Sequence, residues 1–307
     1  MSVRVENLTK MYDDQKAVDD LSFEVTEGRI LGFLGPNGAG KSTTMKIATG
    51  YIPPSQGTVY VNGMDVRSNS LAIRKITGYL AEQNPLYSEM YIAEFLRFCG
   101  GLYELSGRKL KQRVGEMMDL CGLMPEQKKK IGKLSKGYKQ RVGLAQALIH
   151  EPDVIILDEP TSGLDPNQIT EIRNLIKHLS LDKTVLLSTH IMQEVEALCE
   201  DVVIINKGKI VGSGTVDELK SKSEKGMVLI VEFSDVPAVE VLMRINGISE
   251  IEFESKNKIR LYCSKDVDPR SAIFQYASEA KLELLGLQVQ KNSLEEIFTQ
   301  LTKKSDK

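Results

Sequence analysis

The chain has 307 residues, which is enough for one large or two unequal domains with a well-buried core. A formal net charge of −2 excludes the strongly basic surface that nucleic-acid binding usually needs, so no nucleic-acid partner is expected. The four cysteines form no C-x-x-C pair, which argues against a zinc site or a disulfide framework and predicts small buried side chains. No apolar run approaches the roughly 20 residues that span a bilayer, and no signal-peptide core is seen, so a cytoplasmic location is expected.

The first half of the chain changes from strand patterns to helix patterns. Short β-type runs lie at 3–5, 21–25, 30–34 and 58–61. Apolar residues then recur at three- and four-residue intervals over 91–102, 110–121 and 139–149. The sequence therefore predicts a helical insertion at about 85–150 inside one α/β core.

Strands and helices alternate again after the insertion. The apolar run "VIILDEP" begins at residue 154, a helix is predicted over 166–179 with Asp165 as its cap, and the strand "TVLLSTH" follows. Such alternation is typical of a mostly parallel sheet, whose phosphate sites lie at the carboxyl ends of the strands.

A second module is predicted at 227–307, after a charged segment that ends a first domain of residues 1–220. Its strands are expected at 227–233, 248–253, 259–263 and 282–289, and its helices at 238–245 and 271–280. This order is the split βαβ pattern of a small ferredoxin-like α+β domain. A capping box from Ser293 to Glu296 predicts a last helix, and no catalytic residue is expected here.

The stretch "FLGPNGAGKSTTMKI" at 33–47 joins a strand to a helix and meets the spacing G-x-x-x-x-G-K-[ST]. Glycines let the backbone approach a phosphate, and a helix N-terminus attracts anions. Lys41 would add a positive charge, and Ser42 would offer a hydroxyl to Mg²⁺. The residues expected to contact ATP are Gly35, Pro36, Asn37, Gly38, Ala39, Gly40, Lys41, Ser42 and Thr43.

The acidic pair Asp158 and Glu159 ends the strand of "VIILDEP". Beside a phosphate loop, Asp158 is expected to hold the Mg²⁺ shell and Glu159 to deprotonate an attacking water.

Three motifs follow one another along the chain: the phosphate loop, "LSKGYKQRVGLAQAL" at 134–148, and "LDEP". Motifs of these kinds in this order closely resemble the ATP-binding cassette (ABC) family, and the resemblance covers residues 1 to about 220. The resemblance implies a P-loop ATPase fold that hydrolyses ATP with Mg²⁺. Ser135 and Gly137 match the family's signature, which contacts ATP held by a partner subunit. Lys136 and Tyr138 depart from it, so the contacts of the usual glutamine are not carried over.

Other positions match the family pattern one by one. Tyr12 corresponds to the aromatic residue that stacks on adenine, and His190 to the switch histidine that reaches the γ-phosphate. Glu82 or Gln83 corresponds to the Q-loop residue that senses Mg²⁺, and the spacing leaves both open. The D-loop at the dimer interface corresponds to Ser162, Gly163, Leu164 and Asp165.

The resemblance implies a homodimer that closes around two ATP molecules and powers a separate membrane-spanning subunit, so the chain is expected on the inner face of the membrane. More narrowly, the chain is similar to single-cassette ATPases of exporters, among them a gliding-motility-associated ATPase. A soluble non-transport ABC ATPase and an ATP-gated dimer clamp are the alternatives. The apolar residues of 86–95 are expected either to receive a helix of the membrane partner or to form the core of the insertion.

Overall fold

The computed structural model describes residues 2–221, 227–264, 267–290 and 294–304. Its internal contacts divide the chain into two compact units: an N-terminal unit built mainly from residues 1–216 and a C-terminal unit of residues 217–303. Of the residues described, no helix is long and apolar enough to cross a membrane.

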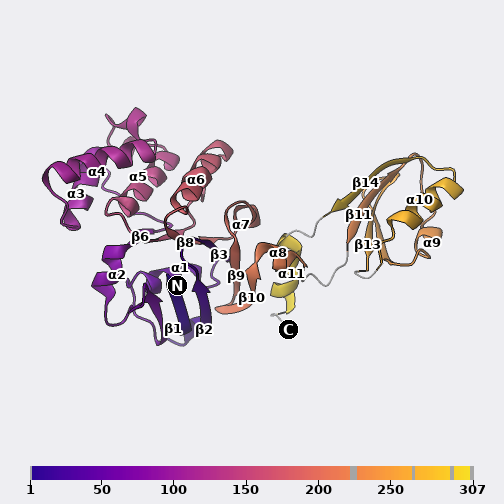
Figure 1. The fold of residues 1–307 in the computed structure, drawn as a ribbon, viewed down its shortest axis with the longest axis horizontal. Helices are drawn as coiled ribbons and strands as arrows, with labels where there is room; N and C mark the ends of the chain where they lie inside the picture. The colour runs from indigo at the N-terminus through magenta and orange to yellow at the C-terminus, as the bar shows by residue number, and fades with distance from the viewer. Residues whose placement is uncertain (1, 222–226, 265–266, 291–293, 305–307) are drawn as a thin grey trace. The chain divides into compact units, whose positions relative to one another are not determined.

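A six-stranded sheet in the order β10-β9-β3-β8-β7-β6 forms the centre of the N-terminal unit (Figure 1). Its strands are β3 (Ile30–Leu34), β6 (Thr77–Leu80), β7 (Val154–Asp158), β8 (Thr184–Thr189), β9 (Asp201–Asn206) and β10 (Lys209–Thr215). All neighbouring strands pair in parallel except β10, which pairs antiparallel with β9. Every residue of β3, β7 and β8 is buried, which explains their nearly unbroken apolar sequences.

A second, antiparallel sheet in the order β2-β1-β4-β5 packs its apolar side chains into the same core. Its strands are β1 (Val3–Tyr12), β2 (Gln15–Val25), β4 (Gln56–Val61) and β5 (Met64–Asp65). The predicted strands at 3–5 and 21–25 are too short. Register shifts along the β1–β2 pair interrupt the regular strand pattern, so the short β-type runs mark only part of each strand.

The helices of this unit fall into two sets. The sheets are accompanied by α1 (Lys41–Ala48), α2 (Ser70–Ile76), α6 (Pro166–Leu179) and α7 (Met192–Leu198). The insertion contains α3 (Ile92–Leu102), α4 (Gly107–Leu120) and α5 (Lys136–Leu148), with 3₁₀ turns at Met124–Glu126 and Ile131–Lys133. Figure 1 shows α3, α4 and α5 gathered together, as the predicted helical insertion requires. The four cysteines of the chain are buried and unpaired, as predicted.

The C-terminal unit has a four-stranded antiparallel sheet in the order β12-β13-β11-β14. Its strands are β11 (Val228–Phe233), β12 (Ile248–Phe253), β13 (Lys258–Cys263) and β14 (Leu284–Gln290). With α9 (Val239–Leu242) and α10 (Arg270–Glu279), this is the ferredoxin-like order that the sequence predicts. The remaining helices, α8 (Val216–Ser221) and α11 (Leu294–Lys304), belong to this unit except for their end residues Val216 and Lys304.

Two details of this unit differ from the prediction or lie beyond it. Helix α9 is shorter than the predicted 238–245, because Arg244 and Ile245 bond to carbonyls only three residues back. Ser293, the expected cap of the last helix, lies outside the described residues.

Candidate functional site

The turn between β3 and α1 is shaped by glycines that cannot be replaced without strain. Gly40 caps α1 with φ 106°, and a Cβ there would collide with the carbonyl oxygen of Ala17. A Cβ on Gly35 would likewise meet the carbonyl oxygen of Ile205. No side chain caps α1 and its first turn has no acidic residue, so its N-terminal N–H groups can receive an anion.

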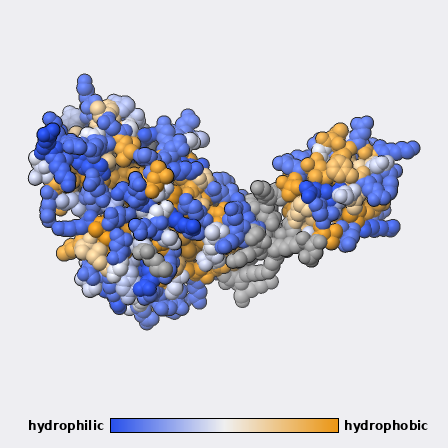
Figure 2. Space-filling model, viewed as in Figure 1, coloured by the Kyte–Doolittle hydropathy of each residue, from blue (hydrophilic) through white to orange (hydrophobic). Residues whose placement is uncertain are grey.

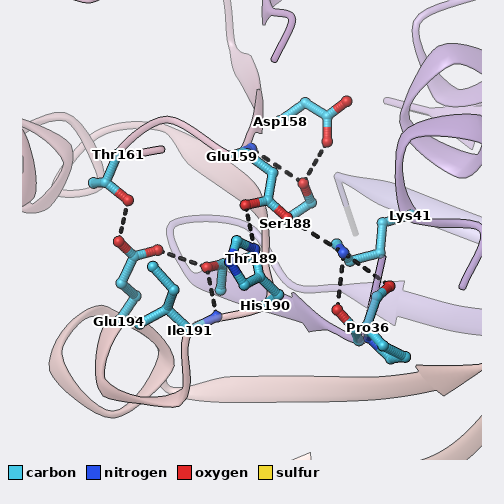
Figure 3. Close-up of polar contacts among 11 residues, drawn as sticks. Pro36, Lys41, Asp158, Glu159, Thr161, Ser188, Thr189, His190, Ile191 and Glu194 are labelled. Carbon is cyan, nitrogen blue, oxygen red and sulfur yellow. Dashed lines mark hydrogen bonds and ion pairs between the residues drawn. The ribbon is translucent and has the colours of Figure 1, made fainter. Parts of the chain in front are cut away.

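Lys41 is held at the centre of this turn. Its Nζ donates to the carbonyl oxygens of Gly35 at 2.8 Å and Pro36 at 3.2 Å, and it pairs with Glu159 Oε1 at 3.3 Å (Figure 3). Only 5% of the Lys41 side chain and 7% of the Glu159 side chain are exposed. A buried ammonium group held by weak carbonyl acceptors can exchange them for phosphate oxygens.

The ends of β7 and β8 bring Glu159 and His190 together. Glu159 Oε2 lies 2.6 Å from His190 Nδ1, and the Glu159 backbone is held by an N–H bond to the Ser188 carbonyl at 3.1 Å. Ser188 Oγ also donates to Asp158 Oδ1 at 2.5 Å. Glu159 has a φ of 53°, a left-handed conformation that a non-glycine residue adopts at a cost. The carboxylate of Glu159 thus joins Lys41 to His190 in one chain of contacts.

A cavity of about 560 Å³ opens over this constellation, a size suited to a small-molecule ligand. Six of the residues predicted to contact ATP line it, and so does the predicted catalytic Glu159: Asn37, Gly38, Gly40, Lys41, Ser42, Thr43 and Glu159. Of the two Q-loop candidates, Glu82 lines this cavity, whereas Gln83 is exposed and is not among its described lining residues.

The donor set of the site fits a phosphate-bound Mg²⁺ ion. Ser42 offers a hydroxyl oxygen at the cavity, and Asp158 is a buried carboxylate at the adjoining strand end. Within the described part of the chain, no group of three or more His, Cys, Asp or Glu residues could hold a metal alone. This suits Mg²⁺, which usually takes one or two protein oxygens and completes its shell with water and phosphate.

Several predicted residues lie away from this cavity. Tyr12 is 48% exposed, with Lys10 Nζ 5.3 Å from its ring centre, and it is not among the described lining residues. Ser135 caps α5, where its Oγ accepts from the Tyr138 N–H at 3.4 Å. Ser135 and Gly137 do not line the cavity either, so one described copy does not bring the signature to the phosphate loop.

The predicted D-loop follows the site directly and lies against the signature of the same chain. The Ser162 N–H donates to the Glu159 carbonyl at 3.1 Å, and Asp165 caps α6 by accepting from the Gln168 N–H at 3.0 Å, as predicted. A Cβ on Gly163 would collide with Lys136 Nζ, so the lysine that departs from the family pattern sits beside the D-loop.

The sequence reasoning missed residues that complete the site. The cavity is also lined by Gln15, Lys16, Ala17, Lys207 and Gly208. Gly208 donates its N–H to the Ala39 carbonyl at 3.0 Å. The sequence "NKGK" at 206–209 indicates a turn, and this was the one signal that could have pointed to Lys207 and Gly208. Glu194, whose carboxylate is buried on α7, gives no signal in the sequence alone, because acidic residues are common in the first turn of a helix.

Family models match both units. A model described as ABC transporter matches residues 18–162, and one described as the C-terminal domain of ATP-binding proteins like DrrA1-3 matches residues 214–302. The bacitracin transport ATP-binding protein BcrA of Bacillus licheniformis is 35% identical over 97% of this chain and 96% of its own length. The linearmycin resistance ATP-binding protein LnrL of Bacillus subtilis is 32% identical over 98% of each chain.

Solved structures agree with this grouping. An ATP-binding subunit of an ABC transporter superimposes with a TM-score of 0.66 at 31% identity, covering 72% of this chain and 93% of its own. A dimeric ATP-binding cassette in a post-hydrolysis state with ADP and Pi superimposes with a TM-score of 0.65 at 26% identity, covering 70% and 98%.

The fold and the phosphate-loop site define an ATP-binding and ATP-hydrolysing cassette of the P-loop class. The chain belongs to the ATP-binding subunits of ABC transporters, and it has a C-terminal domain like that of DrrA proteins. The comparisons do not support the narrower resemblance to a gliding-motility ATPase.

Proposed function

We propose that two copies of this chain sandwich two ATP molecules and drive a separate membrane-spanning exporter subunit from the inner face of the membrane. The observation that carries the proposal is the chain of contacts in which Lys41 and Glu159, both buried and both lining the 560 Å³ cavity, continue to His190. The full-length relatives named for bacitracin transport and linearmycin resistance support export of antibiotic-like compounds.

In this mechanism the α1 N-terminus and Lys41 bind the β- and γ-phosphates, and the Lys41 ammonium leaves the carbonyls of Gly35 and Pro36 to do so. Glu159 accepts a proton from the attacking water, whose oxygen forms the new bond to the γ-phosphorus as the bond to ADP breaks. His190 orients Glu159 through its Nδ1 and carries its other ring nitrogen toward the γ-phosphate. Mg²⁺, held by Ser42 and Asp158, would neutralise charge on the phosphates, with Glu82 rather than Gln83 beside it.

The remaining site residues act between copies in this proposal. The residues Ser135 and Gly137 cap the ATP of the partner copy, and Ser162 to Asp165 cross the dimer interface. This assignment explains why the signature lies away from the cavity of its own chain. Tyr12, by contrast, is proposed to stack on adenine within its own copy, since its ring is 48% exposed and accessible.

The membrane partner is proposed to dock on the exposed apolar side of α3. Tyr87, Phe98 and Leu102 are 51%, 41% and 68% exposed, and Tyr87 packs on Phe98 with ring centres 5.5 Å apart. Figure 2 shows hydrophobic residues among hydrophilic ones over the insertion. Phe95, by contrast, is 3% exposed and belongs to the core, so within residues 86–95 we propose the exposed Tyr87 rather than Phe95 for docking.

A second cavity of about 260 Å³ adjoins the same side of α3. Leu102 lines it with Tyr79 and His150, and the buried Tyr79 hydroxyl and His150 Nδ1 have no hydrogen-bond partner among the described residues. Buried polar atoms beside a cavity are suited to bonds with enclosed water.

The test begins with Glu159→Gln, which removes the base and keeps the shape of the site. With ATP, this variant should elute as a dimer and should retain a multi-spanning protein in stoichiometric amount when purified from gently solubilised membranes. Lys41→Ala should bind no ATP and stay monomeric. Glu104→Gln, which changes an 80% exposed carboxylate paired with Lys75, serves as the matched control.

The outcomes separate the candidate functions. Recovery of only soluble proteins would favour a non-transport ABC ATPase. Dimerisation without measurable ATP turnover in the wild type would favour an ATP-gated clamp, the reading motivated by Glu82, Lys136 and Tyr138. For the C-terminal unit we propose an accessory role in regulation or dimer support.

A further inference from the structure

Glu194 holds two loops of the site together without entering the cavity. It lies in the first turn of α7 and is 1% exposed. Its Oε1 accepts a hydrogen bond from the Thr161 hydroxyl, and its Oε2 accepts one from the Thr189 hydroxyl at 2.6 Å (Figure 3). Both oxygens of one buried carboxylate are thus used on two hydroxyl groups that lie 28 residues apart in the sequence (161 and 189).

Thr161 and Thr189 each flank a residue of the proposed reaction. Thr161 follows Glu159 by two positions, and its carbonyl accepts from the Leu164 N–H at 3.2 Å, which folds the D-loop back toward it. Thr189 precedes His190, and its Oγ accepts from the Ile191 N–H at 3.0 Å, so the same hydroxyl fixes the backbone on both sides of His190.

A buried carboxylate is costly unless its oxygens are hydrogen-bonded, and here both are. An amide could accept at only one of these two positions, since its nitrogen is a donor. A glutamine could bridge the two threonines only if one hydroxyl turned from donor to acceptor, so Glu194→Gln should weaken the link and valine at either threonine should cut it. A shift of residues 162–165 would pull on Thr161 and, through Glu194, on Thr189.

We propose that Glu194 is a positioning residue that couples the D-loop to the Glu159–His190 pair, so that the partner copy, through the D-loop, sets the geometry for hydrolysis. This inference rests on the proposed function, in which the D-loop crosses the dimer interface. ATP binding depends on the phosphate loop, where Lys41 Nζ is held by Gly35, Pro36 and Glu159. Loss of the link should lower kcat and leave nucleotide affinity unchanged.

The experiment measures kcat, KM and the affinity for a non-hydrolysable ATP analogue in Glu194→Gln, Thr161→Val and Thr189→Val. We expect kcat to fall by about 10- to 100-fold in each, the range for small misplacements of reacting groups, with unchanged analogue affinity. Thr161→Ser and Thr189→Ser keep the hydroxyl and should restore kcat. Glu104→Gln should behave as the wild type.

A double-mutant cycle distinguishes coupling from ordinary structural support. If Glu194 joins the two loops, Thr161→Val should cost little further kcat once Thr189→Val has cut the link. Additive losses, or losses of kcat and analogue affinity that follow the melting temperature, would overturn the inference. The two valine variants keep the test available if Glu194→Gln does not fold.

The failure of this inference differs from the failure of the proposed function. Wild-type ATPase that disappears in Glu159→Gln but persists at full kcat in both Thr161→Val and Thr189→Val would refute the positioning role alone. A wild-type chain without ATPase would remove both.

Discussion

The six-stranded sheet of the N-terminal unit and the four-stranded sheet of the C-terminal unit differ in how they bury polar groups. The strands β3, β7 and β8 of the N-terminal unit are buried at every position, whereas β12 and β13 of the C-terminal unit include exposed or half-buried residues. Among the described residues, every buried Ser, Thr, Asn, Asp, Glu or Lys belongs to the N-terminal unit. The C-terminal unit keeps its charges at the surface, as in the partly exposed Arg260 and Glu254 pair.

This difference shows what a parallel sheet contributes to chemistry. Its strands all end at the same edge, so side chains such as Asp158 and Thr189 are brought together in a place that the rest of the fold shields from water. Charge interactions are stronger there than at the surface. An antiparallel sheet with one solvated face offers no such edge, which fits an accessory role for the C-terminal unit.

The largest expected effect is on catalysis at the buried edge. Glu159→Gln should lower kcat by about 10²- to 10⁴-fold, the range for loss of a general base, while ATP still binds. Glu252→Gln, the same change on the exposed face of β12, should leave kcat at the wild-type value. Steady-state ATPase assays and nucleotide titration measure both, and equal losses would contradict the contrast between the sheets.

A core substitution in the C-terminal unit should separate stability from catalysis. Phe233 is fully buried and packs edge-on against Tyr276 with ring centres 6.0 Å apart. Phe233→Ala should destabilise this unit by about 3–5 kcal/mol, because it leaves a cavity. Differential scanning calorimetry should show a lower melting temperature for the unfolding of the C-terminal unit. At temperatures below this transition, kcat should equal the wild-type value. A parallel fall in kcat would show that the unit takes part in turnover.

A pair of glycines tests the same contrast at backbone level. Gly40→Ala places a Cβ against the Ala17 carbonyl at a φ of 106°, and strain of about 1–3 kcal/mol should raise KM for ATP by roughly tenfold or more. Gly286→Ala on β14 meets only Glu232 Cβ at 3.8 Å, so it should change neither KM nor melting temperature measurably. Similar KM values for the two variants would argue against a constrained phosphate loop.

The smallest effect concerns pH. Burial lowers the pKa of His150 from 6.5 to about 4, and the ring stacks on Tyr103 at 3.8 Å. The unfolded chain therefore binds more protons than the folded chain between these values, so stability falls as the pH drops from about 6.5 toward 4. Between pH 7 and 5 the loss should be about 1 kcal/mol after allowance for partial exposure.

His150→Asn should remove this pH dependence, whereas His178→Asn, on the exposed surface of α6, should preserve it. Melting temperatures across the pH range provide the measurement. All three histidines lie in the N-terminal unit, so the acid-sensitive transition should be the one that Phe233→Ala leaves in place.

The sequence predicted the elements best where a local signal marks each end. Helix α6 has the predicted bounds because Asp165 caps it and Pro166 begins it, and β12 matches because Gly247 and the polar residues after Phe253 delimit it. The length of β1 was missed, since its register shifts arise from pairing with β2 and β4 rather than from its own residues.

The same distinction applies to the site. Lys41, Glu159 and His190 each follow a buried strand, so their convergence could be predicted from the parallel sheet alone. Glu194 could not be found this way, because its role depends on two threonine hydroxyls supplied by other loops. Tyr12 and Ser135 lie outside the cavity lining of a single copy, and their predicted roles need a second chain or a bound nucleotide.

The four buried cysteines have a practical consequence for studying the dimer. Burial raises the pKa of Cys99 and Cys263 to about 11 and of Cys121 to about 12, and it also raises the pKa of Cys199, so these thiols stay protonated and shielded from reagents. The native protein should therefore not react with maleimides at its cysteines. A single cysteine introduced at Ser162 would report the approach of two copies by cross-linking, in the otherwise unaltered chain.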